Sequence, residues 1–172
     1  MITAQHTQSL QRIGLMQHKK PIAANNVPAN AIKSVYPEPF ASKMDGRIKK
    51  KLGDHFGLEN FGINLTELSP NAISALKHCH AKQDEFIYIL TGTPTLNYGN
   101  EAFLLEPGDC FGFKAGENIA HQLINHSSET VLYLEIGDRS SGDTVVYPDD
   151  DIAANFQNDS SWRFTHKDGT SY

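Results

Sequence analysis

The stretch that decides the fold is His78-Cys79-His80-Ala81-Lys82-Gln83-Asp84-Glu85-Phe86-Ile87-Tyr88-Ile89-Leu90-Thr91-Gly92. His78 and His80 lie two residues apart, so on an extended chain both imidazoles point to the same face. A polar turn follows, and Glu85 then begins a second apolar segment that ends at Gly92. Two imidazoles and a carboxylate on neighbouring strands can reach one divalent metal ion. Asp84 is the alternative carboxylate if the turn is one residue tighter.

A third imidazole is available later in the chain. His121 follows the turn-forming pairs Gly108-Asp109 and Ala115-Gly116, and Asn125 lies four residues beyond it. We expect His121 to complete the metal-binding set, and Asn125 to form hydrogen bonds behind the ligands rather than to bind metal. The remaining histidines share no such pattern and are left out of the predicted site: His6, His18, His55, His126 and His166.

The two segments resemble the two motifs of the cupin superfamily. The first cupin motif is His-x-His, then Glu, then Gly, and all four residues are present, as His78, His80, Glu85 and Gly92. The second motif is Gly-Asp, Pro-x-Gly, then His and Asn. Here Lys114 replaces the proline, and four residues rather than two separate Gly116 from His121. The resemblance implies an all-β fold, the double-stranded β-helix or jelly-roll barrel, with the metal ion inside it.

The resemblance covers roughly residues 36–172 and extends to segments outside the motifs, such as Tyr36-Pro37-Glu38-Pro39-Phe40 and Trp162-Arg163-Phe164. It is closest to small single-domain bacterial cupins, some of which are named sugar-phosphate isomerases. Because one fold hosts many functions, the name alone does not assign an activity to this chain.

The pattern of short apolar segments also predicts an all-β protein. Residues 61–68 alternate between faces, and Gly, Pro and Asn turns separate the later segments, with a hairpin around Tyr98-Gly99-Asn100 and no convincing helix. We expect strands at 73–80, 85–91, 101–105, 111–113, 121–125, 130–136 and 144–147. This pattern leaves an antiparallel sandwich and a barrel open, and the resemblance selects the barrel.

Length and composition indicate one ordinary globular domain. The chain has 172 residues, 39% of them hydrophobic, and a net charge of −5. We expect residues 1–35 to form a flexible or loosely docked N-terminal arm, and residues 36–172 to form a single barrel domain with a C-terminal extension. No long apolar run or secretory signal is present, so we expect a cytoplasmic protein without membrane or nucleic-acid partners. Cys79 and Cys110 are expected to be reduced thiols.

Three imidazoles and one carboxylate suit Mn, Fe, Ni, Co or Zn, and the ligand types do not choose among these divalent ions. Apolar residues on the same strand faces as the ligands are predicted to line a pocket, although ordinary core packing explains them equally well. The predicted pocket residues are Ile87, Ile89, Leu123, Asn125 and Tyr133. The sequence offers no obvious general base, and Tyr133 and Glu135 are the available candidates.

A cluster of positive charge at Arg47, Lys49, Lys50 and Lys51 precedes the predicted barrel. Charge runs of this kind usually form solvated surface strands or turns. The alternative is a phosphate contact near the mouth of the site, which would matter if the substrate were a sugar phosphate.

Two functions follow from these observations. The first is a metal-dependent enzyme acting on a small polar metabolite, either an isomerase, for example of a sugar phosphate, or an oxygenase. The second is a non-catalytic module that holds a small ligand in the same metal pocket. If Glu85 faces the barrel interior, then Phe86, Tyr88 and Leu90 face outward and need cover. Either the N-terminal segment or a second subunit can supply this cover, and we expect a homodimer.

Overall fold

The computed structural model of the chain describes residues 20–32, 34–157 and 161–172, and almost all of its regular structure is β-strand. The strands are β1 (Arg47–Lys51), β2 (Phe61–Leu68), β3 (Cys79–His80), β4 (Glu85–Thr91), β5 (Thr95–Tyr98), β6 (Glu101–Leu104), β7 (Cys110–Phe113), β8 (His121–Ile124), β9 (Val131–Asp138), β10 (Thr144–Val146), β11 (Ala153–Phe156) and β12 (Trp162–Thr165). The helical elements among these residues are short: the 3₁₀-helices η1 (Ala24–Asn26) and η2 (Ser42–Met44), and α2 (Leu52–His55). None of them has the length and apolar character that a membrane-spanning helix requires.

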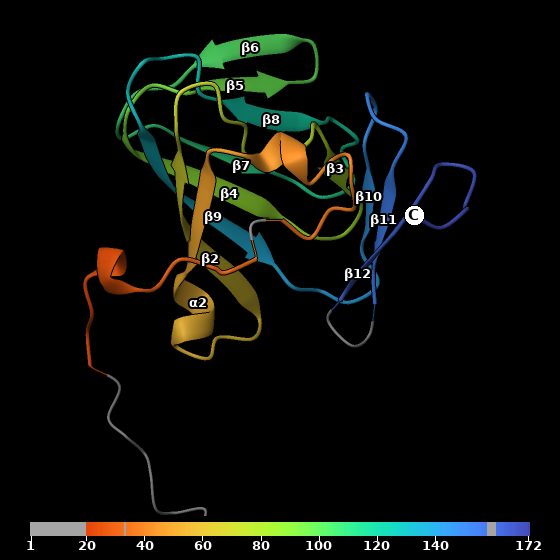
Figure 1. Ribbon diagram of the computed structural model, residues 1–172, viewed down its shortest axis with the longest axis horizontal. Coiled ribbons are helices and arrows are strands. Elements are labelled where there is room, and N and C mark those ends of the chain that lie inside the picture. The colour runs from red at the N-terminus through yellow and green to blue at the C-terminus, as the bar shows by residue number, and fades with distance from the viewer. Residues whose placement is uncertain (1–19, 33, 158–160) are drawn as a thin grey trace, which may run out of the picture.

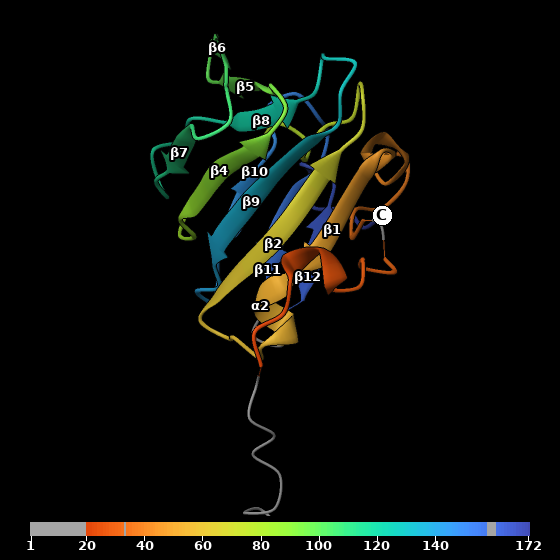
Figure 2. The same ribbon diagram turned by 90° about the vertical axis from the view of Figure 1, so that its left-hand side faces the viewer.

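The strands form three antiparallel sheets that enclose a barrel (Figure 1). A five-stranded sheet has the order β1-β2-β9-β4-β7, a four-stranded sheet the order β12-β11-β10-β3, and a three-stranded sheet the order β6-β5-β8. In Figure 2 the five-stranded sheet presents its outer face to the viewer, and β10, β11 and β12 lie behind it. The all-β barrel predicted from the sequence is therefore confirmed.

Two sequence expectations for regular structure differ from the observed elements. Of the predicted strand 73–80, only Cys79 and His80 form a strand, because the preceding residues bond to β8 through isolated bridges and side chains. One such bond joins the Ser74 hydroxyl to the backbone N–H of Leu123. The chain also makes a single helical turn at Leu52–His55, in a segment where we expected only strand or turn.

The interior divides into two apolar clusters. One fills the barrel between β4, β9, β8 and β5 and includes Ile87, Ile89, Leu123 and Tyr133. The other lies beside the C-terminal sheet and includes Phe40, Met44, Leu76, Val145, Tyr147 and Ile152. The Pro-rich segment 36–40 packs on this second cluster, since the Tyr36 ring lies edge-on to Tyr147 and Phe164 at 5.9 and 5.5 Å.

The described part of the N-terminal arm, residues 20–32 with 34 and 35, runs along the five-stranded sheet beside β1. The backbone N–H of Asn30 donates to the Lys49 carbonyl at 2.8 Å, the Lys50 ammonium donates to the Asn25 carbonyl, and Val27 is buried. The rest of the predicted arm, residues 1–19 and 33, lies outside the described residues.

Candidate metal centre

Three separate parts of the chain bring four potential ligands together at one end of the barrel interior. His80 lies on β3 and His78 immediately precedes it, Glu85 is the first residue of β4, and His121 is the first residue of β8. A backbone bridge between His78 and His121 joins the two histidine-bearing segments directly. The structure therefore assembles all four side chains that the sequence predicted as ligands.

The Oε2 atom of Glu85 is the point on which these side chains converge. It lies 3.5 Å from the Nε2 atoms of His78 and His80, and 3.0 Å from the Nε2 atom of His121. The ligand atoms of His78, His80 and Glu85 all lie within 4.8 Å of one another. Neighbouring ligands bound to one ion at about 2.1 Å are about 3.0–3.4 Å apart, so the spacing suits a metal ion of this size.

Hydrogen bonds behind the ligands fix the orientation of two imidazoles. The Nδ1 atom of His78 lies 2.7 Å from the Leu76 carbonyl, and the Nδ1 atom of His80 lies 2.5 Å from the Oδ2 atom of Asp143. Each bond places a proton on Nδ1 and leaves the Nε2 lone pair directed toward Glu85. His121 is held instead by its ring, which stacks on Phe113 with centroids 3.6 Å apart and planes 9° from parallel.

The charges around Glu85 favour its ionised form. Burial raises the pKa of its carboxyl, but the imidazoles of His121 and His78 outweigh this effect and hold that pKa well below its ordinary value. Burial lowers the pKa of His121. Burial also opposes protonation of His80, yet its hydrogen bond to Asp143 and the charge of Glu85 raise the pKa of this imidazole.

One buried oxygen among the described residues indicates what the centre is suited to bind. Glu85 Oε2 has almost no contact with solvent and makes no hydrogen bond of acceptable geometry, although three imidazole nitrogens surround it. A buried ionised oxygen without a hydrogen-bond donor is costly, and a divalent cation between the four side chains would remove that cost. The buried His78, His80 and Glu85 group could therefore hold a metal ion.

The alternative carboxylate, Asp84, points elsewhere. Its side chain is exposed, and its Oδ1 atom accepts a hydrogen bond of 2.8 Å from the backbone N–H of Ala115. Asp84 thus stabilises the turn before β4, and Glu85 is the residue that faces the three histidines.

A cavity of about 1310 Å³ extends from the metal centre across the inner face of the five-stranded sheet. Ile87, Leu123 and Tyr133 of the predicted pocket line it. Ile89 lies deeper, fully buried in the barrel core, and is not among the lining residues. Asn125 is also fully buried outside the lining, where its amide donates to the carbonyls of Leu68 and Glu129 and supports the β8–β9 turn.

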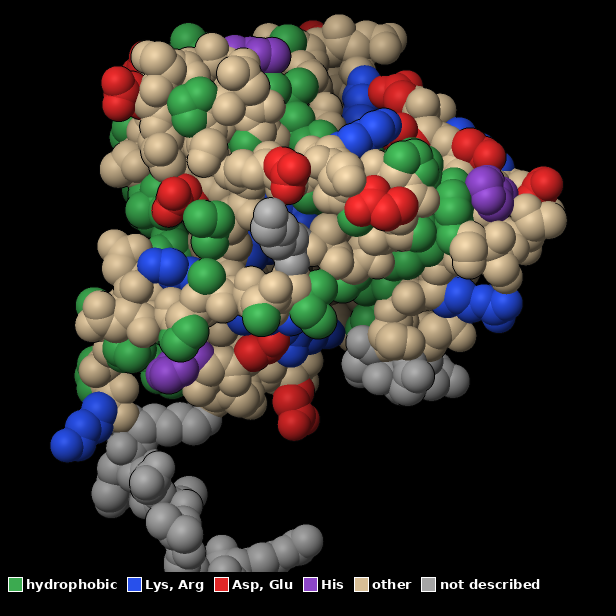
Figure 3. Space-filling model, in the orientation of Figure 1, with side chains coloured by type: hydrophobic (Ala, Val, Ile, Leu, Met, Phe, Trp, Pro, Cys, Tyr) green, Lys and Arg blue, Asp and Glu red, His purple; other side chains and the backbone are tan. Residues whose placement is uncertain are grey.

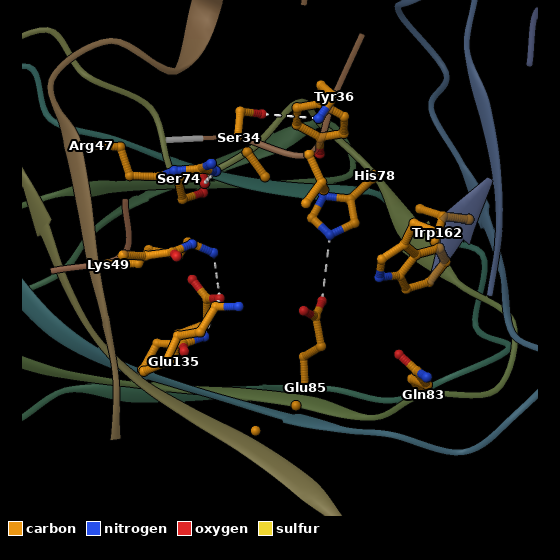
Figure 4. Close-up of a pocket in the computed structure, with 18 of the residues that line it drawn as sticks. Ser34, Tyr36, Arg47, Lys49, Ser74, His78, Gln83, Glu85, Glu135 and Trp162 are labelled. Carbon is orange, nitrogen blue, oxygen red and sulfur yellow. Dashed lines mark hydrogen bonds and ion pairs between the residues drawn. The ribbon is translucent and has the colours of Figure 1, made fainter. Parts of the chain in front are cut away.

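Three of the four positive charges of β1 face this cavity because side chains alternate along the strand. Arg47, Lys49 and Lys51 line the cavity, whereas the Lys50 ammonium lies outside it and bonds to the Asn25 carbonyl. Lys49 points at Glu135, as the close-up shows (Figure 4). The space-filling view shows Lys, Arg and acidic side chains gathered around the middle of the face that Figure 1 presents (Figure 3). The cluster is thus partly a cavity wall rather than a solvated surface strand.

Two features of the site escaped the sequence analysis. Asp143 bonds to His80 across 63 residues of sequence, and its pairing with a histidine motif has no local signal. Trp162, on β12, closes the side of the cavity near His80, with ring centroids 6.0 Å apart. The Gly142-Asp143 pair that precedes β10 marks a turn in the sequence, but only the fold shows that the carboxylate reaches the metal centre.

The chain matches the family profile described as "Cupin domain" over residues 64–137. A comparison with curated protein sequences gives no match. Among solved structures, a sugar phosphate isomerase of the cupin superfamily from Silicibacter pomeroyi DSS-3 is 35% identical in sequence, with a TM-score of 0.83. The alignment covers 89% of this chain and 96% of that one.

Two further structures resemble this one. A protein from Acidithiobacillus ferrooxidans ATCC 23270, provisionally named a sugar phosphate isomerase, is 30% identical with a TM-score of 0.65, and the alignment covers 81% of this chain and 96% of that one. The polyketide cyclase RemF from Streptomyces resistomycificus is 21% identical with a TM-score of 0.56, over 70% of this chain and 79% of that one. The likeness to RemF concerns the fold alone.

Proposed function

Because this chain belongs to the cupin superfamily, we propose that it is a divalent-metal-dependent isomerase that acts on a sugar phosphate. The observation that carries the proposal is that one cavity holds both the His-rich centre and the inward-facing cations of β1. A sugar phosphate presents two kinds of group, adjacent oxygens on neighbouring carbons and a phosphate several bonds away. The cavity offers a metal centre for the first and the lining cations Arg47 and Lys51 of β1 for the second.

His78, His80, Glu85 and His121 would hold the metal ion, and a divalent ion in this position polarises a carbonyl and acidifies a neighbouring hydroxyl. The donor set is compatible with Mn, Fe, Ni, Co and Zn. Asp143 would orient His80, and the stacked Phe113 would keep His121 in place. The two relatives named as sugar phosphate isomerases support this reaction class, since the alignment covers nearly their whole length.

The wall beside the centre is suited to a polar substrate. Lys49 and Glu135 form an ion pair of 2.6 Å, and the buried Arg47 donates to the Ser74 carbonyl. Aromatic side chains from the other sheets, among them Tyr147, Trp162 and Phe164, line the remaining sides. Such rings pack well against the apolar faces of a sugar, while charged groups fix its orientation.

The test is metal analysis followed by an isomerisation assay. We expect the purified protein, after loading with Mn²⁺, Fe²⁺, Ni²⁺, Co²⁺ or Zn²⁺, to bind about one equivalent of metal. With at least one of these ions it should convert members of a panel of aldose phosphates into their ketose isomers: glyceraldehyde 3-phosphate, ribose 5-phosphate, glucose 6-phosphate and mannose 6-phosphate. The double variant His78→Ala/His80→Ala should lose both metal and activity, whereas His126→Ala, an exposed histidine just beyond β8, should lose neither.

Absence of metal after loading would contradict the proposal at its first step. Metal bound at one equivalent without turnover of any panel sugar would contradict the isomerase assignment. If those sugars still raised the melting temperature of the loaded protein, the alternative would stand: a non-catalytic cupin that holds a small ligand.

A further inference from the structure

An ionised carboxylate other than that of the metal centre lies inside the cavity. Glu135 is on β9, with Ile87 of β4 opposite it on one side and Asn64 of β2 on the other. Glu85 stands opposite Gly137, two residues further along β9. Glu85 and Glu135 are therefore diagonal neighbours on the same inner face, with Cα atoms about 7–8 Å apart. Gly137 adds no side chain beside the two carboxylates, and Glu85, Glu135 and Gly137 all line the cavity.

Three side chains hold Glu135 in a defined orientation. The Lys49 ammonium lies 2.6 Å from its Oε1 atom, and the Asn64 amide donates to the same oxygen at 3.2 Å. The Tyr133 hydroxyl donates to the Oε2 atom at 3.3 Å, a long bond that leaves this oxygen lightly held. Figure 4 shows the Lys49–Glu135 pair on one wall of the cavity, beside the group formed by Glu85 and His78. The carboxylate is thus fixed by Oε1, and Oε2 is the atom that can act on a substrate.

An isomerase of the proposed kind needs a group that moves a proton between adjacent carbons, and the other two candidates on β4 and β9 next to the centre, Glu85 and Tyr133, are already committed. Glu85 faces three imidazoles. Tyr133 is buried, and burial followed by the charge of Glu135 raises the pKa of its hydroxyl well above the ordinary value, so it is a donor at neutral pH. Glu135 alone of these three combines ionisation, a fixed position and a lightly held oxygen.

We propose that Glu135 is the catalytic base of this protein and that Lys49 and Tyr133 are its positioning residues. The inference rests on the proposed function, and it adds the residue that carries out the proton transfer. Glu135 Oε2 takes the proton from the substrate carbon that bears a hydroxyl next to the carbonyl. The C–H bond breaks, its electron pair forms the carbon–carbon double bond of an enediolate, the π pair of the carbonyl moves to the carbonyl oxygen, and Glu135 becomes a neutral acid.

Glu135 then returns the proton to the adjacent carbon, while a hydroxyl proton passes from one substrate oxygen to the other. The substrate leaves as the isomeric sugar with the same atoms and the same oxidation level, and Glu135 is again ionised. The reaction therefore needs no external oxidant or reductant.

Charged groups from every neighbouring strand determine the state of this base. Lys49 and Arg47 face it from β1, Glu85 from β4 and Tyr133 from its own strand, whereas Asn64 on β2 does not ionise. Burial raises the pKa of Glu135, but the charge and hydrogen bond of Lys49 outweigh burial and the repulsion from Glu85, so the pKa is lowered. The base is therefore ready at neutral pH, and its protonation should limit the reaction only on the acidic side.

The primary test is Glu135→Gln in the metal-loaded protein, with Glu67→Gln as the matched control. Glu67 lies on β2 of the same sheet, but its position alternates with that of Thr66, so it faces outward. We expect Glu135→Gln to bind metal normally and to lose about 10²–10⁴-fold in kcat, while Glu67→Gln matches the wild type. In D₂O the wild type should wash deuterium into the product at the carbon that receives the proton, and Glu135→Gln should lose this exchange in parallel.

Two further variants separate a chemical role from a structural one and remain informative if Glu135→Gln does not fold. Glu135→Asp keeps a carboxylate and should recover part of the exchange reaction. Lys49→Met removes the charge beside Glu135 and should therefore move the acidic limb of the kcat/KM profile to higher pH. A Lys49→Met limb at the wild-type pH would overturn the role given to this pair.

The inference and the proposed function fail in different ways. Wild-type rates and deuterium exchange in metal-loaded Glu135→Gln would overturn the base assignment and leave the isomerase standing. Complete retention of a carbon-bound deuterium label by the wild type would also overturn it, because a direct hydride shift needs no base. A wild-type protein that binds metal but isomerises no panel sugar defeats the proposed function, and the base assignment with it.

Discussion

Replacing Asp143 with asparagine should weaken metal binding about 10–100-fold, as is usual when the hydrogen-bond partner of a ligating histidine is changed. Asp143 is completely buried and uses both of its oxygens. Its Oδ2 atom lies 2.5 Å from His80 Nδ1, and its Oδ1 atom accepts a bond of 2.7 Å from the backbone N–H of Lys82. Asparagine has the same shape but offers one acceptor oxygen and one NH₂ donor.

The two orientations of the new amide each lose one of these bonds. If the amide oxygen stays on the Lys82 N–H, the NH₂ group faces His80 and favours the tautomer with the proton on Nε2, the nitrogen that should bind metal. If the amide turns over, the NH₂ group faces the Lys82 N–H, and two donors oppose each other in a buried site. A bond to a charged acceptor is worth about 1.5–3 kcal/mol, and tenfold in affinity corresponds to about 1.4 kcal/mol, which agrees with a loss of about 10–100-fold.

The measurement is a competition titration of Zn²⁺ or Co²⁺ between the protein and a chromophoric chelator, at a pH where the imidazoles are neutral. Asp151→Asn is a matched control, because Asp151 also binds a histidine through Oδ2 and a backbone N–H through Oδ1. That pair, with His166 and Lys167, is exposed and outside the cavity. Equal affinities for Asp143→Asn and wild type would refute the role given to Asp143, and equal losses in both variants would show a general effect of the substitution.

Three further outcomes are expected. In the metal-free protein the raised pKa of His80 stabilises the fold below about pH 6.5, and this stabilisation is lost as the pH rises through the folded-state pKa. Metal binding, in contrast, requires the neutral imidazole. The rise in melting temperature on adding metal should therefore grow between about pH 6 and pH 8, and a constant rise would contradict this reasoning. Tyr88 lies 39% exposed on the outer face of β4, so Tyr88→Lys should convert a homodimer into monomers in light scattering, and a monomeric wild type would exclude the dimer. Gly92→Ala should lower the free energy of unfolding by about 1–3 kcal/mol because the backbone of Gly92 is left-handed. A further loss should come from the new methyl group, which would lie 2.8 Å from the Val131 side chain. Gly108→Ala, which has positive φ but nothing within 4 Å, should lose only the backbone contribution in denaturant titrations.

The convergence of His78, His80 and Glu85 could be predicted from the sequence because all three residues belong to one hairpin-like stretch. Strand periodicity places the two histidines on one face, and a short turn brings Glu85 beside them. The prediction of His121 as a ligand depended on the resemblance to the second cupin motif, since nothing in the local sequence connects it to His78. The fold supplies that connection through the backbone bridge between these two residues.

Periodicity was less informative about depth in the barrel. Alternation along β4 correctly places Glu85, Ile87 and Ile89 on the inner face, but it does not show where along that face the cavity ends. Ile87 lines the cavity, whereas Ile89 lies opposite Tyr133 and packs in the core. Which inner residues meet a ligand depends on the side chains that arrive from other strands, and the sequence of one strand does not contain that information.

The basic cluster Arg47, Lys49, Lys50 and Lys51 shows the same limit of strand periodicity, and here the consequence for function is larger. A solvated strand and a cavity wall produce the same run of charges in sequence, because alternation acts in both and only the environment of each face differs. The deciding partner of Lys49 is Glu135, 86 residues away, and both side chains are only about one-fifth exposed. Partly buried ion pairs add little net stability, since desolvation offsets most of their attraction. A pair of this kind on the wall of a cavity beside a metal centre is therefore better explained by what it does to a substrate than by what it contributes to folding.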